Sequence, residues 1–272
     1  MSRTSDVPVV LVTGATSGIG KATAELLASK GYRVFGTSRR PMERTANGFD
    51  MIPLEVSADD SVNACVLAVT EMTGGRIDVL VNNAGTGIFG AVEEVSAEEA
   101  NRLFQVNFFG VMRMTSAVLP HMRARRTGKI INMSSSGGLA SLPFAGIYCA
   151  TKFALEAYTA ALLHEVRPLG IAATIVAPGP VSTPAGDKAM RAERAIEDYA
   201  ERRGRADEMG VRHIRNGIDP ARVAKTILRV IRTKRPGPRY PVGLQARATG
   251  LGRSLLPPSA FAAAIRWGTR LG

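Results

Sequence analysis

Short apolar runs alternate along the chain with longer segments whose apolar residues recur at helical spacing. The run from Val7 to Thr13 is nearly all apolar and ends in a glycine-rich turn, which predicts a buried strand. The segment from Gly18 to Lys30 has helix-forming composition, and Gly31 ends it. By the same criteria, further strands are predicted over residues 32–37, 51–56, 77–81, 129–133, 171–176 and 239–242.

Helix start signals lie between these strands. Two pairs have the spacing of a capping box: Ser57 with Asp60, and Ser96 with Glu99. The first pair predicts a helix to about Met72, and the second a long helix that is ended or interrupted near Pro120. Later helices are predicted over residues 147–166 and from Asp219-Pro220 to about residue 233. Strands that alternate with such helices require right-handed crossovers, so we expect an α/β fold with a parallel sheet.

Two segments depart from the alternation. Residues 184–216 are polar and rich in Arg and Glu, so we interpret them as a loop inserted over a substrate site; a solvated helical excursion fits the composition equally well. Residues 236–272 form an extension in which basic and apolar stretches alternate. The pattern of residues 260–271 predicts an amphipathic helix. The catalytic domain is therefore assigned to residues 1–235. The extension is expected to pack near the substrate or a subunit contact, with a membrane surface as the alternative.

A glycine-rich turn follows the first predicted strand. Gly14, Gly18 and Gly20 allow close approach of a pyrophosphate to the backbone, and the helix that follows offers free N–H groups. The alternative is a tight turn without a ligand. After the second strand the chain reads Thr37-Ser38-Arg39-Arg40, with no carboxylate to receive a ribose 2′-hydroxyl. Because Arg grips phosphate, Arg39 favours NADP(H) over NAD(H).

Tyr148 and Lys152 lie four residues apart on one predicted helical face. A phenol donates protons poorly near neutral pH, but a neighbouring ammonium lowers its pKa. Tyr148 is therefore a candidate acid/base for a carbonyl/alcohol pair, and a nearby hydroxyl from Ser134, Ser135 or Ser136 would place the substrate oxygen. Without the other motifs, a solvated Tyr/Lys pair would be the better interpretation.

Six features occur in a fixed order: Thr13-Gly-x-x-x-Gly-x-Gly20, Asn82-Asn-Ala-Gly85, Asn107, Ser135, Tyr148-x-x-x-Lys152 and Pro178-Gly179. Together they resemble the classical short-chain dehydrogenases/reductases, over about residues 7–235. The sequence between Ser135 and Tyr148 is closest in character to the 17β-hydroxysteroid and retinol dehydrogenase branch. The resemblance implies one Rossmann-type, doubly wound parallel sheet of about seven strands flanked by helices. It also implies hydride transfer between nicotinamide and a carbonyl/alcohol pair.

The resemblance implies roles for individual residues. Tyr148 is the acid/base, Lys152 lowers its pKa and holds the nicotinamide ribose, Ser135 is the catalytic serine, and Asn107 anchors a water relay. The cofactor-binding residues implied are Gly14, Ser17, Gly18, Ile19, Gly20, Arg39, Glu55, Val56, Asn83, Ala84, Gly85, Tyr148, Lys152, Pro178, Gly179, Val181 and Thr183. Glu55-Val56 stands where the family usually has Asp-Val, which puts the adenine contact in doubt.

The substrate is expected to be a bulky hydrophobic ketone or alcohol, steroid-like or retinoid-like. Leu139, Leu142, Pro143, Phe144 and Cys149 would form an apolar wall for it, unless they pack the core below the site. A 3-oxoacyl thioester is the alternative substrate, because a basic protein suits an acidic carrier. A non-enzymatic NADP(H)-binding regulator is the third hypothesis, which the complete catalytic set disfavours.

Charge and composition exclude other classes. The net charge is +12, but the basic residues are dispersed and not interleaved with aromatics, which argues against nucleic-acid binding. Three His and two Cys give no metal site or disulfide framework. No signal peptide and no apolar run of ~20 residues is recognised, so a cytoplasmic enzyme is expected. The family resemblance implies a homodimer or homotetramer formed through two long helices, and residues 101–119 and 154–163 are apolar enough for that contact.

Overall fold

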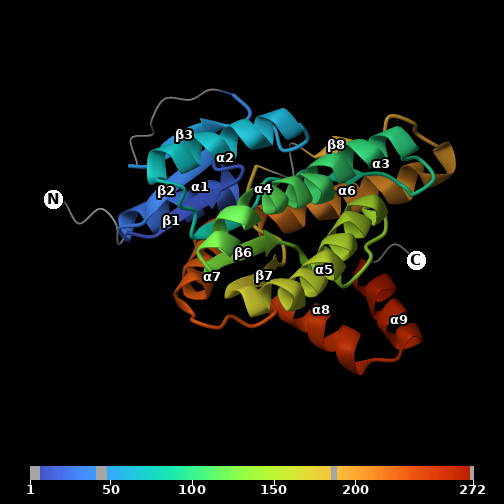
Figure 1. Ribbon diagram of the computed structural model, residues 1–272. Coiled ribbons are helices and arrows are strands. Elements are labelled where there is room, and N and C mark those ends of the chain that lie inside the picture. The colour runs from blue at the N-terminus through green and yellow to red at the C-terminus, as the bar shows by residue number, and fades with distance from the viewer. Residues whose placement is uncertain (1–6, 41–47, 185–188, 270–272) are drawn as a thin grey trace.

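The computed structural model describes residues 7–40, 48–184 and 189–269 (Figure 1). Within these ranges a seven-stranded sheet has the order β3-β2-β1-β4-β6-β7-β9, and every neighbouring pair is parallel. Its strands are β1 (Val9–Val12), β2 (Arg33–Ser38), β3 (Asp50–Pro53), β4 (Val79–Asn82), β6 (Gly128–Met133), β7 (Ile171–Pro178) and β9 (Arg239–Val242). The doubly wound sheet of about seven strands is therefore confirmed.

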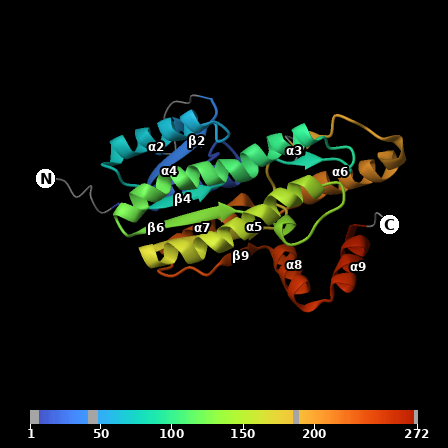
Figure 2. The ribbon, with the colours of Figure 1, turned by 45° about the vertical axis from the view of Figure 1, so that its right-hand side comes forward.

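Helices cover both faces of the sheet, because alternate strand residues point to opposite faces (Figures 1 and 2). Val10 and Val12 of β1 belong to the core beneath α1 and α7, whereas Val9 and Leu11 belong to the core beneath α2, α4 and α5. These strands are apolar on both faces, as expected for a parallel sheet. The five covering helices are α1 (Gly18–Ser29), α2 (Asp59–Thr73), α4 (Gly110–Ala124), α5 (Gly146–Val166) and α7 (Pro220–Arg232).

Of the two predicted capping boxes, one is confirmed and one is wrong. Ser96 caps α3 (Ala97–Phe104) and exchanges hydrogen bonds with Glu99 in both directions. The residue before α2 is Ala58, and Ser57 instead donates a hydrogen bond to Glu55. Since Ser57 lies outside the helix by one residue, its side chain closes the turn that leads into α2.

The long helix that Ser96 opens is continued by a π-helical segment, Gln105–Phe109 (η1), and then by α4. Pro120 lies inside α4, so it does not end the helix as the sequence had suggested. The widened turn of η1 carries Asn107, a predicted site residue. Irregular turns of this kind occur frequently at functional sites.

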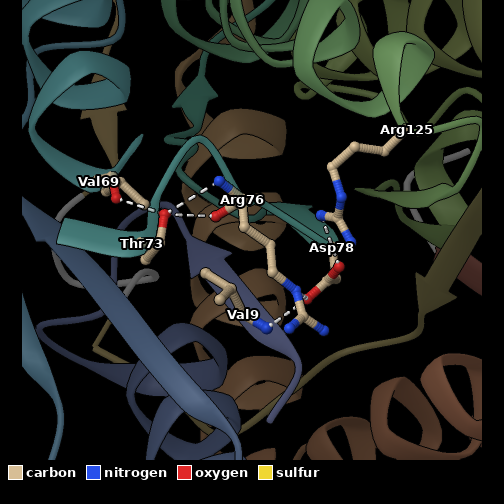
Figure 3. A network of polar contacts seen from close by, with 6 residues as sticks. All are labelled: Val9, Val69, Thr73, Arg76, Asp78 and Arg125. Carbon is tan, nitrogen blue, oxygen red and sulfur yellow. Dashed lines mark hydrogen bonds and ion pairs between the residues drawn. The ribbon is translucent and has the colours of Figure 1, made fainter. Parts of the chain in front are cut away.

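A polar network ties together the amino-terminal edge of the sheet, opposite the predicted site (Figure 3). The carboxylate of Asp78 accepts hydrogen bonds from the backbone N–H of Val9 at 2.7 Å, from Arg76 at 2.7 Å and from Arg125 at 3.0 Å. Thr73 at the end of α2 binds both backbone groups of Arg76. The network fixes the starts of β1 and β4 relative to α2 and α4.

The predicted insertion begins with short elements, of which the first pairs with the segment after β4. They are the short strand β8 (Met190–Arg191) and a 3₁₀ turn at Glu197–Tyr199 (η4), and a longer helix, α6 (Ala200–Arg215, 16 residues), follows them. β8 pairs in parallel with β5 (Ile88–Phe89), a two-residue pairing that the sequence pattern did not predict. Residues 185–188 of the insertion lie outside the described residues.

Residues 236–272 were assigned to an extension, but β9 within this range joins the main sheet, so the sheet continues past residue 235. The chain after β9 forms two helices, α8 (Leu244–Leu255) and α9 (Pro258–Thr269). Only the second was predicted, and its expected end at residues 270–271 lies outside the described residues. Three short turns complete the described structure: Ser136–Gly138 (η2), Arg167–Leu169 (η3) and η4. None of the helices in the described ranges is long and apolar enough to cross a membrane.

Candidate active site

The predicted site residues lie at or near the carboxyl-terminal edge of the sheet. The glycine turn follows β1, Arg39 follows β2, Asn83 follows β4, and Ser135 follows β6. The chain winds outward from β1 in one direction and from β4 in the other, so the edge between them is a topological switch point. Ligands of open α/β sheets bind at such a point.

The glycine turn has a backbone that other residues would strain. Gly14 and Gly18 have φ angles of +69° and +55°, in the left-handed region that glycine tolerates. A Cβ atom on Gly20 would lie 2.2 Å from the carbonyl oxygen of Gly14 and 2.5 Å from Nδ2 of Asn83. Ser17 precedes α1 and its side chain makes no cap hydrogen bond. Ile19 in the first turn packs against the core below.

Hydrogen bonds from neighbouring strands fix this turn. Thr13 Oγ1 accepts from the backbone N–H groups of both Asn83 and Ala84 at 2.9 Å. The amide of Asn83 donates back to the carbonyls of Thr13 and Gly14, at 2.9 and 3.1 Å. Thr37 Oγ1 accepts from Gly14 N–H at 3.1 Å. The ends of β1, β2 and β4 therefore form one rigid unit, and the Asn82-Asn-Ala-Gly85 motif supports the glycine turn.

Arg39 lies exposed two residues beyond Thr37, on the β2 side of the turn. Glu55, the residue that departs from the family pattern, accepts hydrogen bonds from the N–H and hydroxyl of Ser57, at 3.1 and 2.7 Å. The adjacent Val56 is buried against Gly110 at the start of α4. The longer carboxylate thus folds back onto its own turn in this structure.

Ser135, Tyr148 and Lys152 come together where β6 meets α5. The side chains of Tyr148 and Ser135 lie close enough together for the serine hydroxyl to act on the phenol. Lys152 is buried, its Nζ donates to the Met133 carbonyl at 2.9 Å, and the ammonium lies 5.8 Å from the centre of the Tyr148 ring. The turn Ser136–Gly138 packs on the same ring, because a Cβ on Gly137 would lie 3.3 Å from it.

The titration properties of the pair differ from the sequence-based expectation. Burial raises the pKa of Tyr148, with the nearby Ser135 hydroxyl opposing that change. Burial lowers the pKa of Lys152 to about 8, while the nearby Glu156 charge acts in the opposite direction. The predicted lowering of the tyrosine pKa by Lys152 is therefore wrong for this structure, because the ammonium is directed at Met133 and lies over the ring. Tyr148 is held protonated, as a proton donor must be.

Asn107 reaches the site from η1. Its Oδ1 accepts from Thr86 N–H at 2.9 Å, and its Nδ2 donates to the Thr86 carbonyl at 2.9 Å and to Thr151 Oγ1 at 3.2 Å. Gly85 separates Asn107 from the lysine, since a Cβ there would lie 3.2 Å from Asn107 Oδ1 and 3.9 Å from Lys152 Nζ. Asn107 thus joins the β4 loop to α5 beside Lys152.

The residues after β7 close the site from the other side. Pro178 ends the strand, and Gly179 N–H donates to the Val242 carbonyl at 3.0 Å. Val181 is buried and forms a bridge with Ile218. Thr183 packs on the glycine turn, where a Cβ on Gly18 would lie 3.0 Å from its methyl group. The structure therefore brings the β7 loop against the start of α1.

Sequence reasoning missed a charged pair below the site. Glu156 lies one helical turn beyond Lys152 and pairs with Arg239 of β9, with 3.3 Å between Oε1 and Nη2. Burial raises the pKa of Glu156, against the opposing effects of the nearby Ser134 hydroxyl and the Arg239 charge. The i, i+4 spacing from Lys152 was the available signal for Glu156. No local sequence pattern identifies Arg239 as a site residue, because it reaches Glu156 only through the pairing of β9 with β7.

Only some of the residues predicted to form an apolar wall near Ser135 and Tyr148 are accessible at the surface. Leu139, Leu142 and Phe144 are partly exposed. Cys149 is fully buried, and its Sγ accepts from Leu142 N–H at 3.4 Å. The cysteine therefore supports the loop from beneath, and does not line a substrate surface.

Comparisons with known proteins agree with this geometry. The family model for short chain dehydrogenases matches residues 8–194. A 3-ketodihydrosphingosine reductase of Bacteroides thetaiotaomicron is 41% identical over 237 residues, covering 86% of this chain and 87% of that protein. Retinol dehydrogenase 8 of Bos taurus is 34% identical, covering 85% and 80%.

Solved structures give the same result. A short-chain dehydrogenase from Streptomyces avermitilis has a TM-score of 0.81 and 34% identity, covering 98% of both chains. Other similar structures contain NAD or NADH in two cases and NADP or NADPH in others. The chain belongs to the short-chain dehydrogenase/reductase family and is a nicotinamide-dependent oxidoreductase.

Proposed function

We propose that the protein interconverts a bulky hydrophobic ketone and its alcohol with NADP(H), and that Tyr148 is the acid/base. The observation that carries this proposal is the contact of Tyr148 with Ser135 beside the buried Lys152. A binding regulator needs no proton donor, so the complete set favours an enzyme over that alternative.

Residues of this chain supply the proton that the substrate oxygen gains when the carbonyl is reduced. In reduction, Tyr148 donates its phenolic proton to the carbonyl oxygen, which Ser135 holds by a second hydrogen bond. Burial holds the phenol protonated until the substrate oxygen accepts its proton, and Lys152 keeps a positive charge 5.8 Å from the centre of the ring. In oxidation of the alcohol the same proton returns to Tyr148.

The glycine turn fits a dinucleotide. Gly14, Gly18 and Gly20 let the turn pack closely against Asn83, Ala84 and Thr183, and the first turn of α1 offers N–H groups that the Ser17 side chain does not cap. When bound, the nicotinamide supplies or accepts the hydride. We assign Arg39 to the 2′-phosphate because it is exposed at the end of β2 and no carboxylate competes with it.

A hydrophobic substrate is supported by the exposed parts of Leu139, Leu142 and Phe144 between the two catalytic residues. The 41% identity to a 3-ketodihydrosphingosine reductase adds a long-chain lipid ketone to the steroid-like and retinoid-like candidates. The net charge of +12 keeps a 3-oxoacyl group on an acidic carrier as the second candidate.

Loss of NADPH absorbance tests the proposal with four substrates: 3-ketodihydrosphingosine, a steroid ketone, retinal and a 3-oxoacyl thioester. We expect turnover with a hydrophobic ketone, a preference for NADPH over NADH, and a loss of at least ~100-fold in Tyr148→Phe with cofactor affinity retained. Activity confined to the thioester would select the second candidate. Tight NADPH binding with no turnover on any substrate would favour the regulator.

We also propose a homodimer or homotetramer formed through α4 and α5. Phe109, the last residue of η1 before α4, and Phe153 of α5 are each 37% exposed, so both aromatic side chains are accessible to a second copy. Light scattering is expected to give a multiple of the 28.9 kDa chain mass, reduced in Phe153→Glu. A species of single-chain mass at all concentrations would exclude the assembly.

A further inference from the structure

The helical hairpin α8–α9 presents apolar side chains to solvent. On α8, Leu244, Leu251 and Leu255 are 82%, 62% and 70% exposed. Their spacing of seven and four residues puts them on one helical face. Ala246, on the other side of α8, is buried and lies near Gly179. The leucine stripe therefore faces away from the domain.

The second helix also presents an apolar side chain to solvent. Trp267 on α9 is 85% exposed, and α9 has no buried residue in its described length. Its one inward contact of note is Phe261, which lies against Gly252 and beneath the guanidinium of Arg253. In both ribbon views α8 and α9 project from the body of the domain (Figures 1 and 2). The hairpin is thus held together by its inner face, and its outer face is unpartnered within the described residues.

The charges of the hairpin are of one sign. Residues 220–272 contain Lys and Arg but no Asp or Glu, and Arg247, Arg253 and Arg266 are exposed beside the apolar side chains. If a second copy packed on this surface by two-fold symmetry, arginines would face arginines without a carboxylate between them. An anionic bilayer supplies both the opposite charge and an apolar layer, and tryptophan favours its interface.

We propose that the α8–α9 hairpin docks the protein on anionic lipid membranes, lying in the interface without crossing it. The docking surface consists of Leu244, Leu251, Leu255 and Trp267 with Arg247 and Arg266. α8 also contacts the loop after Ser135, since a Cβ on Gly250 would lie 3.7 Å from Leu139. Docking therefore brings that loop close to the bilayer, from which a lipid ketone could enter. This last consequence rests on the proposed function, whereas docking itself does not.

The test uses the full chain and vesicles of phosphatidylcholine with or without phosphatidylglycerol. Trp267 is the only tryptophan of the sequence, so its fluorescence reports directly on the surface. We expect the protein to sediment with the anionic vesicles, its emission to shift to shorter wavelength, and both effects to weaken with salt. Arg247→Gln and Arg266→Gln should each lower the partition constant about fivefold, which corresponds to about 1 kcal/mol per basic residue.

Matched variants distinguish docking through this surface from non-specific adsorption of the protein to vesicles. The pair Leu251→Ser and Leu255→Ser should abolish binding, whereas Leu67→Ser, which alters a 58% exposed leucine on α2, should not. Arg212→Gln removes an exposed charge elsewhere and should leave binding unchanged. Reduction of a small water-soluble ketone by the leucine variant shows whether the fold is intact, independently of membranes.

Two results would overturn the proposal. One is an absence of binding to anionic vesicles, or equal binding with and without phosphatidylglycerol, by a protein that is folded. The other is a blue shift of Trp267 that depends on protein concentration without vesicles and is lost in the leucine variant, because a second copy would then cover the surface.

Discussion

Arg239 of β9 forms an ion pair with Glu156 of α5, with Nη2 3.3 Å from Oε1 and both side chains about four-fifths buried. The same nitrogen lies 3.5 Å from the carbonyl oxygen of Ser135. The Glu156 charge also acts on Lys152, whose pKa it raises against the effect of burial. The pair therefore links the backbone of the catalytic serine to the charge state of the catalytic lysine.

Glu156→Gln should move the alkaline limb of the pH–activity profile to lower pH. The variant removes the charge that favours the Lys152 ammonium, so the lysine loses its proton earlier as pH rises. It also leaves Arg239 partly buried without its partner, which should cost roughly 1–3 kcal/mol of unfolding free energy. The pH dependence of kcat measures the first effect and urea unfolding the second.

A purely structural role for Glu156 would lower stability but leave the pH profile in place. Glu201→Gln is the matched control, because it breaks an exposed ion pair with Arg205 on α6. We expect that control to change neither the profile nor the stability appreciably, as is usual for exposed ion pairs.

Lys152 should make the stability of the apoprotein rise with pH above about 8. Burial lowers its pKa from 10.5 to about 8, so between these values the unfolded chain binds a proton that the folded chain has released. Unfolding free energy then increases with pH, by up to about 1.4 kcal/mol per unit within that window, relative to Lys152→Met. Below pH 8 the burial cost is present in full. Urea unfolding of both proteins at several pH values measures the difference, and a constant difference would contradict the burial of a titrating lysine.

Arg39→Ala should raise the KM for NADPH roughly 10- to 100-fold and leave the KM for NADH nearly unchanged. This increase is what the loss of one charge-assisted hydrogen bond to a phosphate is expected to cause. The reason is that only NADPH carries the 2′-phosphate. Arg40→Ala is the adjacent control and should have the smaller effect. A larger effect at Arg40, or an equal loss with both cofactors, would remove Arg39 from its assigned role.

Local patterns were sufficient for the sheet and much of the site. Apolar runs such as Val9–Val12 mark strands buried on both faces, and the glycine spacing of residues 14–20 marks the turn whose positive φ angles only glycine adopts readily. Tyr148 and Lys152 were found because four residues make one turn of helix.

Other features depend on contacts between distant segments, which no local pattern contains. Arg239 approaches Glu156 only because β9 joins the edge of the sheet. The direction of the Lys152 ammonium depends on the Met133 carbonyl at the end of β6, so its effect on the Tyr148 pKa could not be foreseen. The β5–β8 pairing involves two residues on each side, too few to give an alternating pattern.

The inserted segment is held against the domain by Glu94, whose side chain is fully buried. Its carboxylate accepts from the N–H groups of Ala91 at 2.8 Å and Ile196 at 2.9 Å, and pairs with Arg203 of α6. Burial by itself raises the pKa of Glu94, but the hydrogen bonds from Ile196 and Ala91 and the charge of Arg203 bring it below the usual value. The stabilisation is therefore present above the unfolded pKa and is lost as pH falls through the lower folded pKa.

Glu94→Gln should loosen residues 189–203 at neutral pH. A glutamine keeps one oxygen acceptor, but its NH₂ group faces donors on Ile196 or Ala91 and cannot neutralise Arg203. Cleavage by trypsin after the exposed Arg194 should become roughly tenfold faster or more, as expected when 1–3 kcal/mol of local hydrogen bonding is lost. The cleavage rate of the wild type should approach that of the variant only at acidic pH, where Glu94 becomes protonated. A protease that is active at acidic pH measures that rate. Glu193→Gln, which alters a carboxylate that is 78% exposed, should be cleaved like the wild type. Equal cleavage of Glu94→Gln and wild type would mean that other contacts hold the insertion in place.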